Sequence, residues 1–96
     1  MAVRLTWNQA KDRANQLKHR ISFETARRVF DDPLSLSKLD LGSREERWLT
    51  VGLIDGVAVV VVHTWSEAEE SEATGRIISA RKATRHETKA YEEGAF

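Results

Sequence analysis

The sequence contains no cysteine, which excludes a disulfide framework and a thiolate metal site. Its longest run of apolar residues, at 57–62, is far shorter than the roughly 20 residues that a membrane-spanning helix requires. The chain does not open with a charged segment followed by an apolar one, so we expect no export signal. These absences favour a cytoplasmic protein without a membrane partner.

Several kinds of catalytic site also lack their residues. The three histidines, His19, His63 and His86, do not stand at helical or turn spacing from one another, and no carboxylate pattern accompanies them. We therefore expect no metal and no cofactor. No glycine-rich phosphate loop occurs. The carboxylate pairs at 31–32 and 45–46 are adjacent in sequence, so they would not face each other on a helix.

What is present is the composition of one globular domain, which we place at residues 1–96. Hydrophobic residues make up 41% of the chain and charged residues 31%, a balance that is too apolar for a disordered protein. The net charge is zero, but residues 1–39 carry +4, residues 40–75 carry −6 and residues 76–96 carry +2. This pattern indicates a polyanionic partner or an acidic–basic protein interface, unless it is only an unevenly charged surface.

The N-terminal third predicts one strand and two helices. Alternation over residues 3–7 predicts a short strand, after which Asn8 can cap a helix that ends near His19. Ser22 can cap a second helix, which the Asp32-Pro33 step ends. The predicted buried faces are Ala10, Ala14 and Leu17 on the first helix, and Phe23, Ala26, Val29 and Phe30 on the second.

The rest of the chain predicts further strands and a C-terminal helix. The strands are expected at residues 34–37, 47–53, 57–64 and 75–80. Asp55-Gly56 indicates a hairpin, and the strand after it is apolar on both faces, which places it in the centre of a sheet. The acidic stretch 66–73 is expected to be an exposed loop. Thr84 and Glu87 form a capping box for a helix that runs to about Glu93.

This order of elements predicts an α+β fold. Sequential strands joined by a tight hairpin favour an antiparallel sheet of about four strands, with two N-terminal helices and a C-terminal helix packed on it.

The residues that could do chemistry are mostly basic. Arg76, Arg81 and Lys82 lie on or just after the last predicted strand, and guanidinium groups bind phosphate through paired hydrogen bonds. Because Arg76 and Arg81 are five positions apart, they would point to opposite faces of an unbroken strand. They can converge only if the strand ends or bulges before Arg81. The same cations could instead keep an exposed strand edge from pairing with another chain.

Three further residues could complete a nucleic-acid site. His19 could carry a proton, Arg47 could add a positive charge, and Trp48 could offer a stacking surface for a base. His63 follows a run of valines, which favours a half-buried histidine with its hydrogen bonds satisfied.

The sequence resembles the BrnT family of small toxins from type II toxin–antitoxin pairs. The resemblance covers residues 7–91 and depends on the combination of motifs rather than on any single one. The motifs are Trp7-Asn8-Gln9-Ala10-Lys11, Asn15, Lys18-His19, Phe23-Glu24, Ala26, Val29-Phe30-Asp31-Asp32-Pro33, Glu46-Arg47, Gly52-Leu53, Asp55-Gly56 with the valine strand, Arg76-Ile77-Ile78-Ser79-Ala80-Arg81-Lys82-Ala83-Thr84, Glu87 and Tyr91.

The resemblance implies a fold like that of RelE-type ribonuclease toxins, an RNA substrate, and growth arrest through blocked translation. It also implies a BrnA-like antitoxin with a ribbon-helix-helix DNA-binding end, a hetero-oligomer of the two proteins, and binding of operator DNA only through the antitoxin. Such a complex would repress its own operon.

The resemblance further implies which residues act. The expected catalytic residues are His19, Arg47, Arg76 and Arg81, and the expected substrate-binding residues are Trp48, Lys82 and Tyr91. This chain departs from the family pattern at Asn8, where the family usually has aspartate, and at Arg20, where it usually has glycine. A glycine at that second position would form a left-handed helix end, in which arginine costs about 1 kcal/mol. The acidic stretch 66–73 also looks longer than the family norm.

Two main hypotheses of function follow from these residues. The first is a metal-independent endoribonuclease whose arginines hold the scissile phosphate. The second is an interaction module without catalysis, which binds an acidic partner or a ribosomal surface and would retain RNA without cleaving it. A third hypothesis, a scaffold that acts with the antitoxin on DNA, would change operon expression without changing growth.

Overall fold

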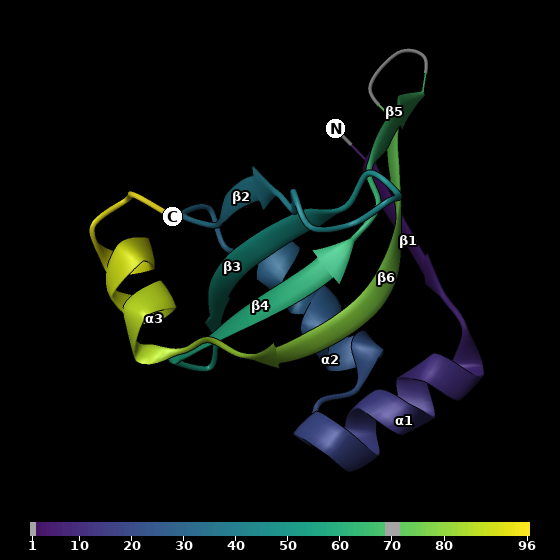
Figure 1. The fold of residues 1–96 in the computed structure, drawn as a ribbon, viewed down its shortest axis with the longest axis horizontal. Coiled ribbons are helices and arrows are strands. Elements are labelled where there is room, and N and C mark those ends of the chain that lie inside the picture. The colour runs from purple at the N-terminus through teal and green to yellow at the C-terminus, as the bar shows by residue number, and fades with distance from the viewer. Residues whose placement is uncertain (1, 69–71) are drawn as a thin grey trace.

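The computed structural model describes residues 2–68 and 72–96, which form a mixed sheet with helices packed on it (Figure 1). In chain order the elements are β1 (Ala2–Trp7), α1 (Gln9–His19), α2 (Phe23–Ala26), the 3₁₀ helix η1 (Arg27–Asp31), β2 (Leu36–Leu39), β3 (Trp48–Ile54), β4 (Val57–His63), β5 (Ser66–Ala68), β6 (Glu72–Lys82) and α3 (Arg85–Glu92). The strand order is β1-β6-β4-β3-β2, with β5 also paired to β6. The predicted α+β class is confirmed.

The prediction of a purely antiparallel sheet is wrong at one edge. β1 runs parallel to β6, with Ala2 opposite Glu72 and Trp7 opposite Ile77. The other pairings among the described strands are antiparallel. Hairpin signals report only strands that a short turn connects, whereas β1 pairs with a strand from the other end of the chain.

The acidic stretch is not only a loop. Residues 66–68 form β5, and β6 already begins at Glu72, with Ser66 opposite Thr74. Residues 69–71 of the predicted loop lie outside the described part of the chain. β5 adds to β6 beyond the point where β4 ends, so it is an edge strand, and charged residues are common at such edges.

β2 begins two residues later than predicted because the Asp32 side chain organises a turn before it. Asp32 Oδ1 accepts a hydrogen bond from Leu34 N at 2.9 Å, and the Asp32 carbonyl accepts one from Ser35 N at 3.0 Å. These bonds hold residues 33–35 in the turn, and the strand starts at Leu36.

The predicted helix caps are confirmed. Asn8 Oδ1 accepts hydrogen bonds from the backbone of residues 10 and 11, and Ser22 Oγ accepts one from Thr25 N. Thr84 and Glu87 form the complete capping box at the start of α3. Each cap satisfies backbone N–H groups that the helix itself leaves without partners.

The buried face predicted for α1 is wrong. Ala10, Ala14 and Leu17 are exposed, and Leu17 keeps 85% of its surface in solvent. The buried residue of α1 is Asn15, which is 6% exposed. Its side-chain amide donates to the Ala80 carbonyl and accepts from Ala80 N, so the helix docks on β6 through polar contacts.

No helix in the described residues is both long and apolar enough to span a bilayer.

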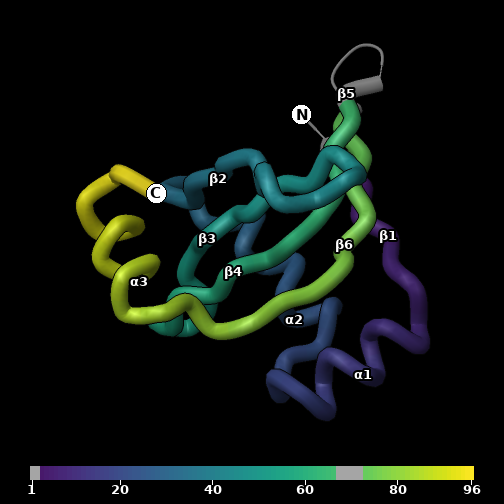
Figure 2. Tube along the Cα trace, in the orientation of Figure 1, coloured from purple at the N-terminus to yellow at the C-terminus, as the bar shows by residue number. Residues whose placement is uncertain are grey.

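The core lies on both faces of the sheet. On one face, α2 and η1 contribute Phe23, Ala26 and Val29 to a cluster with residues of β4 and β6. On the other face, Tyr91 of α3 packs over Val51 and Val60. The C-terminal end then returns to β2 (Figure 2). There, Lys38 Nζ lies 4.4 Å from the centre of the Phe96 ring. β4 is therefore central and covered on both sides, as its apolar sequence predicts.

Candidate functional site

A bulge in β6 determines where its arginines point. Val62 of β4 lies opposite Ser79 and His63 lies opposite Ile77, which leaves Ile78 as an extra residue. Ile77 and Ala80 consequently both face the cluster around Phe23. The predicted condition for convergence is met in part: Arg76 and Arg81 share the opposite face, but they stand roughly 16 Å apart along the strand.

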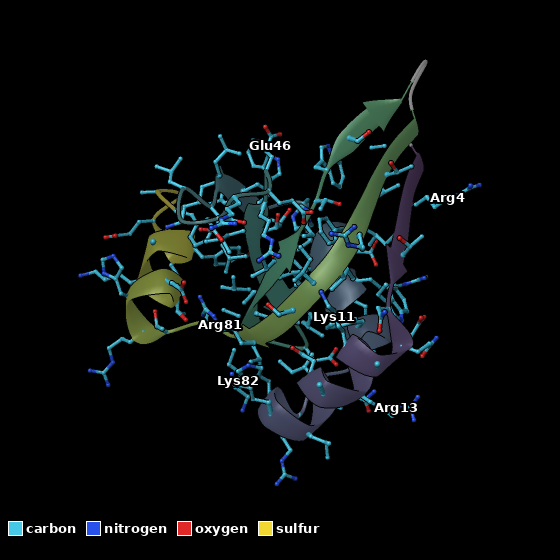
Figure 3. All side chains as sticks on the ribbon, turned by 45° about the vertical axis from the view of Figure 1, so that its right-hand side comes forward. Arg4, Lys11, Arg13, Glu46, Arg81 and Lys82 are labelled. Carbon is cyan, nitrogen blue, oxygen red and sulfur yellow. The ribbon has the colours of Figure 1, made fainter. Side chains whose placement is uncertain are left out.

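A basic cleft lies where α1 ends and β6 meets α3. It has a volume of about 440 Å³, and its lining residues are Lys18, His19, Arg20, Arg81, Lys82 and Thr84. Figure 3 shows Arg81 and Lys82 at this end of β6, with Arg81 directed towards α3. Three of the predicted site residues, His19, Arg81 and Lys82, are thus brought together by segments about 60 positions apart in sequence.

The end of α1 supplies one wall of this cleft. Arg20 adopts the left-handed conformation, with φ 61° and ψ 28°, and its backbone N–H donates to the Gln16 carbonyl at 2.9 Å. This is the helix end that the family's usual glycine would form, here made by arginine at a cost of about 1 kcal/mol. The partial negative charge of the helix terminus attracts the positive charge of the Lys18 side chain beside it.

Arg81 is held in place by helix α3. Its Nη1 and Nη2 atoms donate to the two carboxylate oxygens of Glu87 at 2.7 and 3.0 Å. The bond from Arg81, together with bonds from Thr84, lowers the pKa of Glu87 to about 2. The capping box of α3 therefore also orients a guanidinium group at the cleft. Among the described residues, Lys18, Arg20 and Lys82 make no ion pair.

Arg47 and Arg76 form a separate cluster at the opposite end of the sheet. Glu45 joins them, because its Oε1 lies 2.8 Å from Arg76 Nη2 and 3.6 Å from Arg47 Nε. The Arg47 Nε atom is buried and makes no hydrogen bond. Neither arginine lines the cleft that holds His19. The structure thus divides the four predicted catalytic residues between two places.

The remaining predicted site residues lie elsewhere. Trp48 is half-buried and lines a pocket on the face of the sheet that α2 and η1 cover. Tyr91 is buried under α3, and its hydroxyl donates to Asp32 Oδ2 at 2.5 Å. This bond raises the pKa of Tyr91 to about 12. Asp32, which directly follows η1, also accepts a hydrogen bond from Leu53 N at Oδ2, so the pair ties α3 to the end of η1 and to β3.

Sequence reasoning missed Arg20, Lys18 and Thr84 as neighbours of His19. The signal was present in the run Lys18-His19-Arg20, where three basic side chains crowd the end of one helix. What the sequence did not show is that β6 ends beside this run. In the described part of the chain, no group of three histidine, aspartate or glutamate side chains is placed to hold a metal ion.

Comparison with known families agrees with this picture. Residues 7–87 match the family model described as the ribonuclease toxin BrnT of the type II toxin–antitoxin system. No curated protein matches the chain. The matched segment begins at the last residue of β1 and ends in α3, so it includes every residue that lines the basic cleft. The chain belongs to the BrnT family of ribonuclease toxins, whose members have an antitoxin as partner.

Proposed function

We propose that this protein is a metal-independent endoribonuclease, related in fold to RelE-type toxins, that cleaves RNA and blocks translation. The observation that carries the proposal is the cleft in which His19 stands among Arg20, Arg81 and Lys82. An imidazole can take up a proton, and fixed cations can hold a phosphate and stabilise its developing charge. Membership of a ribonuclease toxin family supports the same chemistry.

In the proposed reaction, His19 removes the proton from an RNA 2′-hydroxyl, and the 2′ oxygen attacks the adjacent phosphorus. The bond from phosphorus to the 5′ oxygen of the next nucleotide breaks, and that oxygen takes up a proton from solvent. The products are a 2′,3′-cyclic phosphate and a 5′-hydroxyl. Arg81 and Lys82 would stabilise the extra negative charge on the phosphoryl oxygens, with Arg81 held in orientation by Glu87.

We assign Arg47 and Arg76 to binding RNA rather than to the reacting phosphate. They stand at the other end of the sheet from His19, on either side of Glu45. A phosphate that displaced the Glu45 carboxylate would gain two cations. These contacts would position the strand without choosing its sequence.

The proposed partner is a BrnA-like antitoxin with a ribbon-helix-helix end. It would neutralise the toxin in a hetero-oligomer, and the complex would bind operator DNA through the antitoxin and repress its own operon. The family supports an antitoxin as the partner.

The decisive experiment is cleavage of labelled RNA by purified protein, with and without EDTA. His19→Ala should abolish cleavage and Lys82→Ala should reduce it at least tenfold, while binding of RNA by the His19 variant persists. Arg13→Ala is the matched control, because Arg13 is an exposed cation of α1 outside the cleft (Figure 3). Cleavage by folded His19→Ala at the wild-type rate would refute the assignment.

Arg81 needs its own control. Its replacement by alanine would leave the Glu87 carboxylate, whose side chain is 15% exposed, without its main partner. Arg81→Ala should therefore be paired with Arg81→Ala/Glu87→Gln. Loss of cleavage in both variants, with wild-type unfolding in the second, would separate catalysis from folding.

One observation favours the second candidate, a non-catalytic module that binds an acidic partner. Arg76 and Arg81 both donate hydrogen bonds to carboxylates of their own chain, Glu45 and Glu87, so these guanidinium groups are placed to bind acidic side chains. The two functions give different results in the same assay. A module would retain RNA or an acidic peptide and leave RNA intact at long incubation with excess protein.

A further inference from the structure

A second pocket, of about 430 Å³, lies on the face of the sheet that η1 covers. Its walls include three aromatic rings, those of Phe30, Trp48 and Trp65. Its polar groups come from Ser37, Thr50 and His63 on three neighbouring strands, and from Ser35 just before β2. Pockets of this size, mostly apolar with a few converging polar groups, are typical of small-molecule sites. None of these residues lines the basic cleft.

Three of these polar side chains and the Thr64 carbonyl form one series of hydrogen bonds. Ser37 Oγ lies 2.7 Å from Thr50 Oγ1, which lies 2.6 Å from His63 Nε2, and His63 Nδ1 lies 2.8 Å from the Thr64 carbonyl oxygen. His63 is 2% exposed, and burial lowers its pKa, which favours the neutral ring.

The direction of this chain follows from its last member. The Thr64 carbonyl can only accept, so Nδ1 of His63 carries the proton and Nε2 accepts from Thr50. The single hydroxyl proton of Thr50 is thereby used, so Ser37 must donate to Thr50. The Ser37 oxygen is left with free lone pairs and no free proton. The pocket therefore presents a hydrogen-bond acceptor there.

Two of the three aromatic rings, those of Phe30 and Trp65, are held in a defined arrangement. Phe30 and Trp65 stack at 5.9 Å with an angle of 14° between their planes. The His63 ring meets Phe30 edge-on at 4.9 Å and Trp65 edge-on at 5.7 Å. Because these contacts fix the rings before any ligand arrives, a planar ligand would find a preformed stacking surface.

We propose that this pocket binds a nucleobase, stacked on its aromatic wall and donating an N–H hydrogen bond to Ser37 Oγ. Stacking on aromatic side chains suits any base, and the acceptor adds a preference for bases with an N–H group directed at Ser37. The inference rests on the proposed function only for the source of the base, which we take to be RNA. Arg47 directly precedes Trp48 and Glu45 joins it to Arg76, so the two cations that we assign to RNA binding lie at the same end of the sheet, with Arg76 on its other face.

The test uses tryptophan fluorescence of a Trp7→Phe variant, which keeps only Trp48 and Trp65. Trp7 packs on Phe23, outside this pocket. Adenosine should quench the remaining emission, and purine riboside, which lacks only the 6-amino group, should bind about 2- to 10-fold more weakly.

Two further variants separate stacking from hydrogen bonding. Ser37→Ala should bring the ratio between adenosine and purine riboside close to one and leave purine riboside binding unchanged. Trp48→Ala should weaken both ligands about fivefold or more. Two results would overturn the proposal. One is an equal affinity of the Trp7→Phe protein for adenosine and purine riboside, and the other is an affinity for both nucleosides that Trp48→Ala leaves unchanged.

A short single-stranded RNA distinguishes the source of the base. If the base comes from RNA, the RNA should quench the fluorescence at a lower concentration than adenosine does. An RNA of the same length without bases should then not quench it. Quenching by adenosine alone would instead indicate a free nucleoside and overturn the RNA assignment, and no quenching by either would overturn the base site. Nucleoside binding does not depend on cleavage, so an inactive His19→Ala protein can be used throughout. A negative result in these binding measurements would therefore overturn the nucleobase site alone, because RNA cleavage is measured in a separate assay.

Discussion

The Asn15 side chain makes, at one residue of β6, the two backbone hydrogen bonds that a neighbouring strand would otherwise make. β1 pairs with β6 only as far as Ile77, and Ala80 lies beyond that pairing. The Asn15 side chain donates to the Ala80 carbonyl at 2.9 Å and accepts from Ala80 N at 3.0 Å, as a neighbouring strand would. It also donates to the Ile21 carbonyl at 2.9 Å. An amide is one of the few side chains that can both donate and accept in this way.

Replacing Asn15 by alanine should therefore lower the free energy of unfolding by about 3 kcal/mol, because the buried N–H and C=O of Ala80 lose their partner. Urea denaturation followed by circular dichroism would measure it. Gln16→Ala is the control, since Gln16 only donates to Asp12 on the exposed side of α1 and should change stability little. A change below about 0.5 kcal/mol for Asn15→Ala would contradict this account.

Arg20 is a strained residue at the proposed site. Its φ of 61° favours glycine, so Arg20→Gly should raise the free energy of unfolding by about 1 kcal/mol. The same change removes one cation from the cleft, so affinity for RNA should fall. A rise in stability together with a loss of RNA affinity, measured on one protein sample, would show that the strain is kept for function. Unchanged affinity would remove Arg20 from the site.

At the scale of elements, α3 is joined to β6 by an ion pair that titrates. The pKa of Glu87 is about 2 in the folded protein, against its ordinary value of 4.5. Because the folded pKa is the lower one, the pair stabilises the protein fully above pH 4.5, and this contribution is lost as the pH falls from 4.5 towards about 2. Glu87→Gln should flatten the stability curve in that window.

The check is the unfolding midpoint in urea at several pH values between 2 and 6, compared with Glu92→Gln, an exposed glutamate of the same helix. An identical pH dependence for the wild type and Glu87→Gln would contradict the assignment. Buried His63 also has a lowered pKa, so the stability that its neutral ring contributes begins to fall near pH 6.5, above the Glu87 window, and this fall is the same in both proteins.

The sequence predictions are correct for some elements and wrong for others. The caps at Asn8, Ser22 and Thr84 and the Asp55-Gly56 hairpin are confirmed, because each depends on residues within a few positions of one another. In the hairpin, φ is 50° at Asp55 and 82° at Gly56, as a type I′ turn requires. The exposed stripe of α1 was mistaken for its buried face, because spacing shows that a helix has an apolar face and not which side meets the sheet.

At the scale of the whole molecule, zero net charge conceals a local excess. Lys18, Arg20 and Lys82 gather at one cleft, and none of the residues that line it is acidic. Affinity for single-stranded RNA should therefore fall with salt, and the slope of log affinity against log salt should become shallower by about 0.7 for each phosphate-contacting cation removed. Lys82→Ala should show this change and Arg13→Ala should not, in titrations by fluorescence anisotropy. Equal slopes for the two variants would contradict it.

The candidate site could be predicted only in pieces. His19, Arg81 and Lys82 were recognised from their chemical types and from family resemblance, and they line one cleft. Arg47 and Arg76 stand at the other end of the sheet. Neither composition nor spacing could show this separation, because it depends on which end of each strand meets which helix.

The sequence by itself determined the class of fold, the positions of the caps and the hairpin, and the absence of thiolate chemistry. These follow from interactions between near neighbours or from the residue types alone. Only the tertiary structure decided the parallel pairing of β1 with β6, the bulge at Ile78 that turns Arg76 and Arg81 to one face, and the meeting of α1 with the end of β6. Each joins or aligns segments distant in sequence, and its free energy comes from the packing of the whole chain rather than from any local pattern.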